Sequence, residues 1–204
     1  DLTVGGIFIW RDYYKTEYAI HEGILYFKVD YPGFGTLFTL PQGGDRKREY
    51  RQIADYCARR GLPVSFYPIP EQEVEPLVAF FPCGKVMTDR STWDYLYRAE
   101  DLQYFKGKKL AGQRNHVNRF LAEHPDVRIL PLSEETLPDA RALADRWHAR
   151  RTPEEDAGME LVALNRAFAH WQELELEGLV MYVGEQVVAM TMGSRLAPAS
   201  FRAS

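Results

Sequence analysis

The chain has 204 residues, 46% of them hydrophobic and 26% charged, and its formal net charge is −4. This composition is typical of a soluble globular protein and excludes a disordered or fibrous chain. Because the whole protein is mildly acidic, attraction to a phosphate-bearing partner has to come from a local cluster of cations.

The cysteines and the chain ends bear on the location of the protein and on the length of the natural chain. Only Cys57 and Cys83 occur, which is too few for a disulfide framework or a zinc finger and favours a reducing, cytoplasmic location. The sequence contains no secretory signal and no apolar run long enough to span a bilayer, so we expect no transmembrane segment. The chain opens at Asp1 without an initiator Met and closes just after a predicted hairpin, so we expect a piece of a longer protein.

Two strands and a helix are predicted first along the chain. Residues 23–31 and 35–41 are rich in β-branched and aromatic residues, and the turn sequence Pro-Gly-Phe-Gly separates them. A helix follows, with Asp45 as its N-cap, apolar residues at helical spacing and Gly61 as its C-cap.

A third strand and a short helix come next. The sequence predicts the strand at residues 62–70 and the helix at residues 71–81, where Pro76 limits its length. The resulting order of strand, strand, helix and strand indicates α/β character.

The second part of the chain repeats this pattern without repeating its sequence. We predict a strand at residues 126–132, a helix at 138–151 that begins at a proline, and a longer helix at 158–178. A hairpin is predicted at 179–196, with its turn at Gly184.

These elements predict an α/β (α+β) fold with two lobes. We place the first lobe at residues 1–125 and the beginning of the second at residues 126–204. The seam between them is expected near residues 122–130, where no low-complexity linker occurs.

The most unusual segment is Gly107–Phe120, which contains two lysines, two arginines, two asparagines and a histidine, and no acidic residue. On a helix over residues 112–123, at about 100° per residue, Val117, Phe120 and Leu121 share one side, which we expect to face the core. The polar side chains lie on the other sides of this helix or just before its start: Lys108, Lys109, Arg114, Asn115, His116, Asn118 and Arg119.

Two interpretations of this segment stay open. It is either a solvated helix face with capping donors, or a site for a phosphate or carboxylate made of planar donors and free N–H groups at the helix start. Lysines at a helix start oppose the helix dipole unless an anion is present, and Asn and His cost helix propensity. These two points are the argument for an anion site.

The stretch upstream of the basic segment is rich in aromatic residues, among them Trp93, Tyr95, Tyr97, Tyr104 and Phe105. We expect most of them to lie in the core. The alternative is that one or two of them, with Tyr95 and Tyr97 as candidates, stack against a base or an acyl group.

Glu160 is a candidate general base. On the helix predicted at 158–178 it falls between Ala167 and Trp171, inside an apolar arc. An ionised carboxylate there needs a partner or its pKa rises, and a raised pKa suits a base that acts on an amine or hydroxyl nucleophile. The alternatives are a buried salt bridge to an arginine and a frayed first turn that leaves Glu160 in water.

Other motifs are weaker. The sequence Pro-Gln-Gly-Gly-Asp at residues 41–45 either cradles a phosphate with its backbone N–H groups or forms a tight turn with an N-cap. His148 and His170 lie on separate predicted helices without metal-ligand spacing, so we predict no metal site.

Three stretches of the sequence carry a resemblance to a known family: IFIWRDYY, WDYLYRAEDLQYFKGKKLAGQRNHVNRF and MELVALNRAFAHWQELELEG. With them the chain resembles the phosphatidylglycerol lysyltransferase C-terminal domain family over nearly its whole length. The resemblance implies two tandem lobes of the acyl-CoA N-acyltransferase (GNAT) type, with mixed sheets flanked by helices and a second lobe that is incomplete in this chain. Membrane enzymes of this family move an amino acid from aminoacyl-tRNA to a lipid headgroup, and related bacterial enzymes use aminoacyl-tRNA to build peptidoglycan cross-bridges.

The resemblance also implies roles for particular residues. Glu160 and His116 are the candidate catalytic residues. For binding phosphate or substrate it implies Lys108, Lys109, Arg114, Asn115 and Asn118. The helix face and the aromatic stretch described above add Arg119, Tyr95 and Tyr97 as candidates. The chain departs from the family where further basic residues are common and it has Ala111, Gly112 and Gln113, which weakens the case for strong binding of tRNA phosphates.

Three functions remain open at this stage. The first is an acyltransferase or aminoacyltransferase, with aminoacyl-tRNA or acyl-CoA as donor and a small molecule or lipid headgroup as acceptor. The glutamine/arginine-x-x-glycine-x-glycine loop of CoA users is not visible, which favours the tRNA acceptor end over an acyl-CoA-dependent N-acetyltransferase. The second is a non-catalytic GNAT-like module that binds an anionic ligand, and the third is an ion-pair scaffold in which carboxylates of the protein neutralise Arg114 and Arg119.

Overall fold

The computed structural model describes residues 3–88, 90, 93, 95–151, 157–198 and 200–203. Its first part contains a three-stranded sheet with the order β1-β2-β3, in which both strand pairs are antiparallel. The strands are β1 (Glu17–His21), β2 (Ile24–Tyr31) and β3 (Gly35–Phe38). The two predicted strands are confirmed, and the turn between them uses positive φ angles at Gly33 and Gly35.

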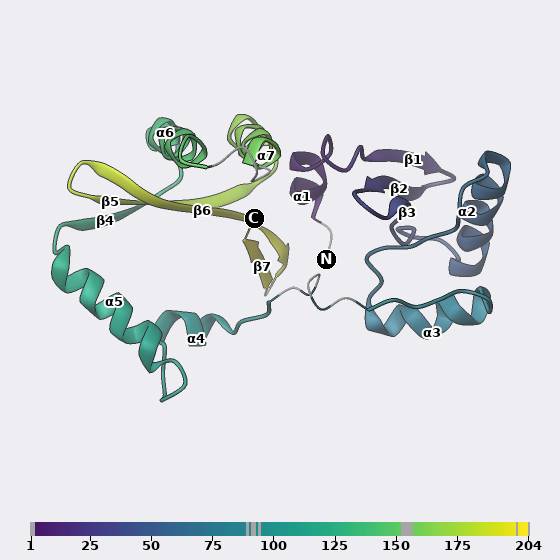
Figure 1. Ribbon diagram of the computed structural model, residues 1–204, viewed down its shortest axis with the longest axis horizontal. Helices are drawn as coiled ribbons and strands as arrows, with labels where there is room; N and C mark the ends of the chain where they lie inside the picture. The colour runs from purple at the N-terminus through teal and green to yellow at the C-terminus, as the bar shows by residue number, and fades with distance from the viewer. Residues whose placement is uncertain are drawn as a thin grey trace.

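Two helices pack beside this sheet (Figure 1). They are α2 (Arg46–Arg60) and α3 (Glu71–Phe80), and both were predicted. The α2 caps are the predicted ones: the Asp45 side chain accepts from two backbone N–H groups, and Gly61 ends the helix with a φ of 65°. Tyr50, Ile53 and Cys57 are buried on its inner face, so the helical spacing identified the core side correctly.

The strand predicted at residues 62–70 does not form. Only Phe66 pairs there, as an isolated parallel bridge to Phe38. The Phe38 N–H donates to the Ser65 carbonyl over 2.8 Å, and the Tyr67 N–H donates to the Phe38 carbonyl over 2.9 Å. The segment holds three prolines, which have no N–H to donate, so the ladder cannot continue beyond this bridge.

The second part contains a four-stranded antiparallel sheet with the order β4-β5-β6-β7. Its strands are β4 (Val127–Pro131), β5 (Leu176–Val183), β6 (Gln186–Ala197) and β7 (Ser200–Ala203). The predicted strand at 126–132 and the predicted hairpin are confirmed, and the α/β fold class with sheets flanked by helices is confirmed as well. All described strand pairs are antiparallel, so the expected mixed character is limited to the parallel bridge in the first part.

The helices α6 (Leu137–His148) and α7 (Ala157–Ala169) lie on one side of this second sheet (Figure 1). α7 ends earlier than the predicted helix at 158–178. Glu175 has a left-handed φ of 51°, and the next residue, Leu176, is buried at the start of β5. Pairing with β6 therefore outweighs the helical pattern at this end.

The sequence did not predict helix α1 (Val4–Ile9), which packs into the core of the second part (Figure 1). Ile9 is 5% exposed and belongs to the same buried cluster as Ala167 and Phe168. Arg166 on α7 donates to the Ile9 carbonyl over 2.9 Å and also bonds the Asp12 carboxylate. The beginning of the chain is thereby fixed to a helix far along the sequence.

Replacing Ile9 by alanine is expected to lower the free energy of unfolding by about 2–4 kcal/mol, because it leaves a cavity in this core. The measurement is urea denaturation followed by circular dichroism. The matched control is Val4→Ala on the same helix, where the side chain is 78% exposed and the expected change is within about 0.5 kcal/mol. Equal losses in the two variants would contradict the docking of α1.

Candidate functional site

The predicted basic segment lies on an exposed pair of helices, α4 (Ala99–Tyr104) and α5 (Ala111–Glu123), which we call the basic arm. Figure 1 shows the arm on the side of the second sheet opposite α6 and α7. Neither helix has a buried residue. The helix predicted at 112–123 is confirmed, whereas α4 was not predicted.

The expected core face of α5 is not a core face in this structure. Val117 is 42% exposed and Leu121 is 47% exposed, and Phe120 is half-buried against the ring of His124 at a centroid distance of 4.8 Å. A helical wheel gives the side on which apolar residues gather, but not whether another element covers that side. In the described part of the chain no element buries this side of α5.

Arg114 faces the backbone of the arm itself. Its guanidinium donates to the Phe105 carbonyl and, over 3.4 Å, to the Gly107 carbonyl. Phe105 closes α4 with a left-handed φ of 45°, so Arg114 satisfies carbonyls at the turn between the two helices. Its partners among the described residues are carbonyl groups and not carboxylates, so none of them neutralises the positive charge of Arg114.

The other polar side chains of the arm point to solvent. Arg119 pairs with Glu123 at 4.0 Å on an exposed surface, where such a pair contributes little to stability, and it lies 3.4 Å from Nδ1 of His116. The remaining candidates are exposed and make no side-chain hydrogen bond or ion pair with another described residue: Lys108, Lys109, Asn115 and Asn118. The arm therefore presents donors that the described carboxylates do not neutralise, which speaks against the ion-pair scaffold.

The aromatic residues upstream of the arm are also exposed, so the expectation that most of them lie in the core is wrong. Trp93 is 61% exposed, Tyr95 is 87% and Tyr97 is 60%. The rings of Tyr95 and Tyr97 stack at a centroid distance of 6.3 Å and an interplanar angle of 16°. This geometry favours the alternative, in which ring faces are available for a planar ligand.

Glu160 lies in the first turn of α7, with its side chain 43% exposed, and its Oε2 is 3.6 Å from Nη1 of Arg151. The expected position inside an apolar arc is therefore wrong, and Trp171 lies beyond the end of the helix. The structure instead pairs Glu160 with an arginine, as one alternative expected, but the pair is partly exposed and not buried, so the carboxylate also reaches water. Arg151 is itself stacked on the Trp147 ring at 4.0 Å, which holds the guanidinium beside Glu160.

The structure does not bring Glu160 and His116 together, because α7 and α5 lie on opposite sides of the second sheet (Figure 1). The sequence at 41–45 is a turn with an N-cap, since the Asp45 carboxylate already accepts from the N–H groups of Lys47 and Arg48. Among the described residues, no three His, Cys, Asp or Glu side chains are grouped to hold a metal ion. None of the described helices combines the length and the hydropathy that a membrane crossing needs.

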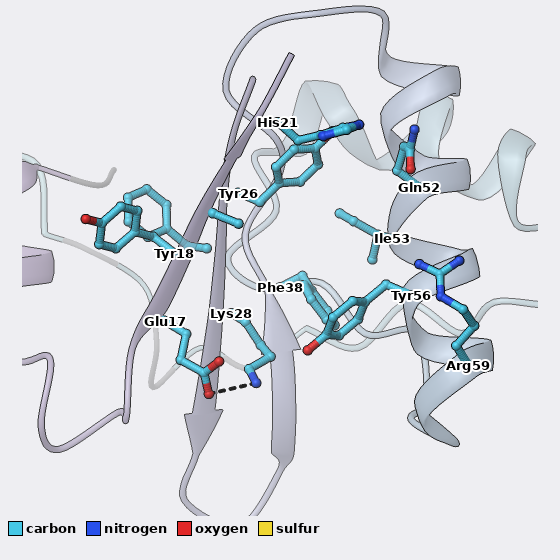
Figure 2. Close-up of a pocket in the computed structure, with 12 residues that line it drawn as sticks. Glu17, Tyr18, His21, Tyr26, Lys28, Phe38, Gln52, Ile53, Tyr56 and Arg59 are labelled. Atoms are coloured by element: carbon cyan, nitrogen blue, oxygen red, sulfur yellow. Dashed lines mark ion pairs between the residues drawn. The ribbon is translucent and has the colours of Figure 1, made fainter. Parts of the chain in front are cut away.

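Sequence analysis missed a cavity of about 320 Å³ between the first sheet and α2, which we call the first-sheet cavity (Figure 2). Beside it, Tyr26 donates a hydrogen bond to Glu49, whose side chain is only 2% exposed. Burial and this hydrogen bond raise the pKa of Tyr26 to about 12. The one available signal was a glutamate directly before buried Tyr50 on the inner face of a predicted helix.

Comparison with known proteins now adds the family. Residues 1–202 match the family described as phosphatidylglycerol lysyltransferase, C-terminal. The chain belongs to this family. The resemblance found in the sequence is thereby confirmed.

Two solved structures are similar to this chain in fold. A conserved protein of unknown function from Bacteroides thetaiotaomicron is 28% identical, with a TM-score of 0.85 over 94% of this chain and 66% of that one. The C-terminal domain of a lysylphosphatidylglycerol synthetase from Agrobacterium fabrum is 13% identical, with a TM-score of 0.53 over 89% of this chain and 56% of that one, and shows the fold alone. This chain thus spans less than two thirds of either of those chains. No curated protein matches it.

Replacing Tyr26 by phenylalanine in this lysyltransferase-family domain is expected to lower the free energy of unfolding by about 1–3 kcal/mol at neutral pH, because it removes the hydrogen bond to a buried carboxylate. The raised pKa means that the folded state holds the Tyr26 proton more tightly than the unfolded chain, where the ordinary value is 10.0. This stabilisation is complete below about pH 10 and is lost as the pH rises toward 12.

Urea denaturation between pH 8 and pH 12, as rough limits, checks this expectation. The loss of stability in the alkaline range should be smaller for Tyr26→Phe than for the natural chain. Tyr18→Phe is the control, since that side chain is 72% exposed and its replacement should leave the pH profile unchanged. Identical alkaline profiles for Tyr26→Phe and the natural chain would show that the Tyr26 hydroxyl does not titrate as described.

Proposed function

We propose that this protein transfers an acyl group from a phosphate-bearing donor, with aminoacyl-tRNA as the donor of choice, to an amine or hydroxyl acceptor. The observation that carries the proposal is the basic arm of a member of this family, where Lys108 and Lys109 have no carboxylate partner among the described residues, and where exposed, stacked tyrosines precede the arm in the chain. By family analogy the acceptor is a lipid headgroup or a small molecule. An aminoacyl-tRNA donor also implies a cytoplasmic reaction.

The chemistry of the arm suits single-stranded nucleic acid. Lys108 and Lys109 stand directly before α5, where unpaired backbone N–H groups add to the attraction for phosphate. Tyr95 and Tyr97 offer ring faces on which a base can stack, an interaction worth about 1–3 kcal/mol per base. A CoA donor would need only a compact pyrophosphate loop, and the sequence lacks its usual glycine pattern.

Within this proposal the two candidate catalytic residues take different roles. Glu160 is the general base that removes a proton from the nucleophile, and its ion pair with Arg151 keeps the carboxylate oriented. His116 lies near Arg119 on the arm, so we assign it to phosphate binding together with Asn115 and Asn118. Arg114 acts by holding the turn between α4 and α5.

A second candidate function is a non-catalytic module that binds an anionic ligand. The separation of α7 from α5 favours it, because the base and the donors of the arm do not share one pocket (Figure 1). Glu160 also lines neither the first-sheet cavity nor the cavity beside Trp147. The acyl transferase is expected to turn over its donor and the binding module is not, whereas both are expected to bind an anionic ligand.

The first experiment measures binding. A single-stranded RNA with the sequence of a tRNA acceptor end should bind the protein, and the double change Lys108→Gln and Lys109→Gln should reduce the slope of log K against log salt by about one per lysine. The control is Lys47→Gln on α2, an exposed lysine far along the chain from the arm. Equal slopes for all three proteins would contradict the assignment of the arm.

The second experiment measures transfer. The protein is mixed with charged tRNA or with acyl-CoA in the presence of an amine acceptor, and loss of the acyl ester is followed over time. Glu160→Gln should reduce the rate at least about tenfold without weakening RNA binding, because general base catalysis contributes about 100-fold or more. RNA binding with no ester loss in the natural protein would support the non-catalytic binding module. Loss of the acyl-CoA ester alone would identify acyl-CoA, and not aminoacyl-tRNA, as the donor.

A further inference from the structure

We propose that the first-sheet cavity binds a small aromatic carboxylate. This site goes beyond the proposed transfer reaction, since it lies between the first sheet and α2, in the half of the molecule away from the basic arm (Figure 1). The family match assigns no ligand to it. The inference rests on the shape of the cavity, its ring faces and its unpaired cation.

The shape comes from one strand face. Register places Glu17, Ala19 and His21 of β1 opposite Lys28, Tyr26 and Ile24 of β2, all on the side of the sheet that faces α2. Ala19 stands between two longer side chains and leaves the space above it open. Figure 2 shows the labelled side chains of this face pointing toward α2, across the hollow.

The walls are mostly apolar and aromatic. Phe38 and Ile53 are 5% and 4% exposed and form the base of the cavity. The rings of Tyr26 and Tyr56 lie beside them (Figure 2), and Arg60 covers the Tyr56 ring from 5.0 Å, which limits its motion. Such walls match the flat faces of one aromatic ring.

The charges on the rim favour an anion. Glu17 and Lys28 form an ion pair at 2.8 Å and cancel one another. Arg59 and His21 also line the cavity, and neither makes a hydrogen bond or ion pair with another described residue. Arg59 therefore leaves a net positive charge, and its planar fork of donors fits a carboxylate. Gln52 adds a neutral donor and acceptor on the same helix.

The size of the cavity narrows the ligand class. Small-molecule pockets run from about 300 to 1,000 Å³, and a volume of about 320 Å³ lies at the low end of that range. It fits one ring with a short carboxylate arm and does not hold a nucleotide or CoA. The apolar base removes the ring from water, while the carboxylate stays at the rim beside Arg59.

The test uses para-hydroxyphenylacetate as the probe, with para-cresol as the same ring without the carboxylate and acetate as the carboxylate without the ring. Calorimetry and amide shifts of isotope-labelled protein should show saturable binding of the probe, with shifts confined to β1, β2, β3 and α2. Para-cresol should bind at least about tenfold more weakly, as expected when a charge-assisted hydrogen bond is lost, and acetate should not bind measurably.

Two pairs of variants locate the site. Arg59→Gln should lower the affinity for the probe at least about tenfold. Arg51 is an exposed arginine on the same helix that does not line the cavity, so Arg51→Gln should leave the affinity for the probe within about twofold. Ala19→Trp should fill the hollow and abolish binding. Ile20→Trp, on the opposite face of the same strand and outside the cavity lining, should preserve it and controls for folding of β1.

The outcomes decide the proposal directly. Absence of saturable shifts in the natural protein overturns it, whatever the variants do. Equal affinity for the probe and para-cresol would contradict the carboxylate contact assigned to Arg59. Unchanged affinity of Ala19→Trp for the probe would show that the probe does not bind in the first-sheet cavity. None of these results depends on the basic arm, so transfer activity can be present or absent independently of this site.

Discussion

The structure depends on the contact between the start of the chain and α7. Arg166 has its side chain only 13% exposed, so its charge needs partners, and it finds them in the Ile9 carbonyl and the Asp12 carboxylate. Ile9 fills the core of the second part, and the residues that follow lead directly to the first sheet. There the Asp30 N–H donates to the Tyr14 carbonyl over 2.7 Å, and the Tyr14 ring stacks on Tyr31 at 5.2 Å. One buried arginine therefore fixes the chain segment that joins the two sheets.

This connection explains how the basic arm can stay exposed. The arm is the second covalent link between the sheets, but α1 already holds them, so α4 and α5 have no buried residue. Arg114 then supplies the local order that packing does not, because it bonds the carbonyls at the turn between the helices. An acidic protein thus carries a positively charged surface whose charges are available to a ligand.

The sequence predicted what depends on local chemistry. Asp45 and Gly61 mark the ends of α2, and the hairpin turn at Gly184 and most of the strands follow from their residue patterns. It failed where the outcome depends on distant contacts, as for α1, whose place is set by Arg166, and for α7, which ends where Leu176 pairs with β6.

The candidate site follows the same rule. The cations of the arm could be read from composition, whereas the exposure of Tyr95 and Val117 could not, because burial is a property of neighbours and not of a residue. The first-sheet cavity lay beyond sequence reasoning, since β1 alternates in register but shows no hydrophobic alternation.

The separation of the basic arm from Glu160 bears on the nature of the donor. Binding energy from a remote part of a substrate assists a reaction only if the same substrate reaches the reacting centre. The arm and the first turn of α7 lie on opposite sides of the second sheet (Figure 1). The acyl group of a compact donor held by the arm would therefore not reach Glu160. A long polyanion can contact the arm through its phosphates and present its esterified end at a distance, and its affinity would then come from many weak, salt-sensitive contacts. Under the proposed transfer reaction, this separation therefore fits a nucleic-acid donor better than acyl-CoA.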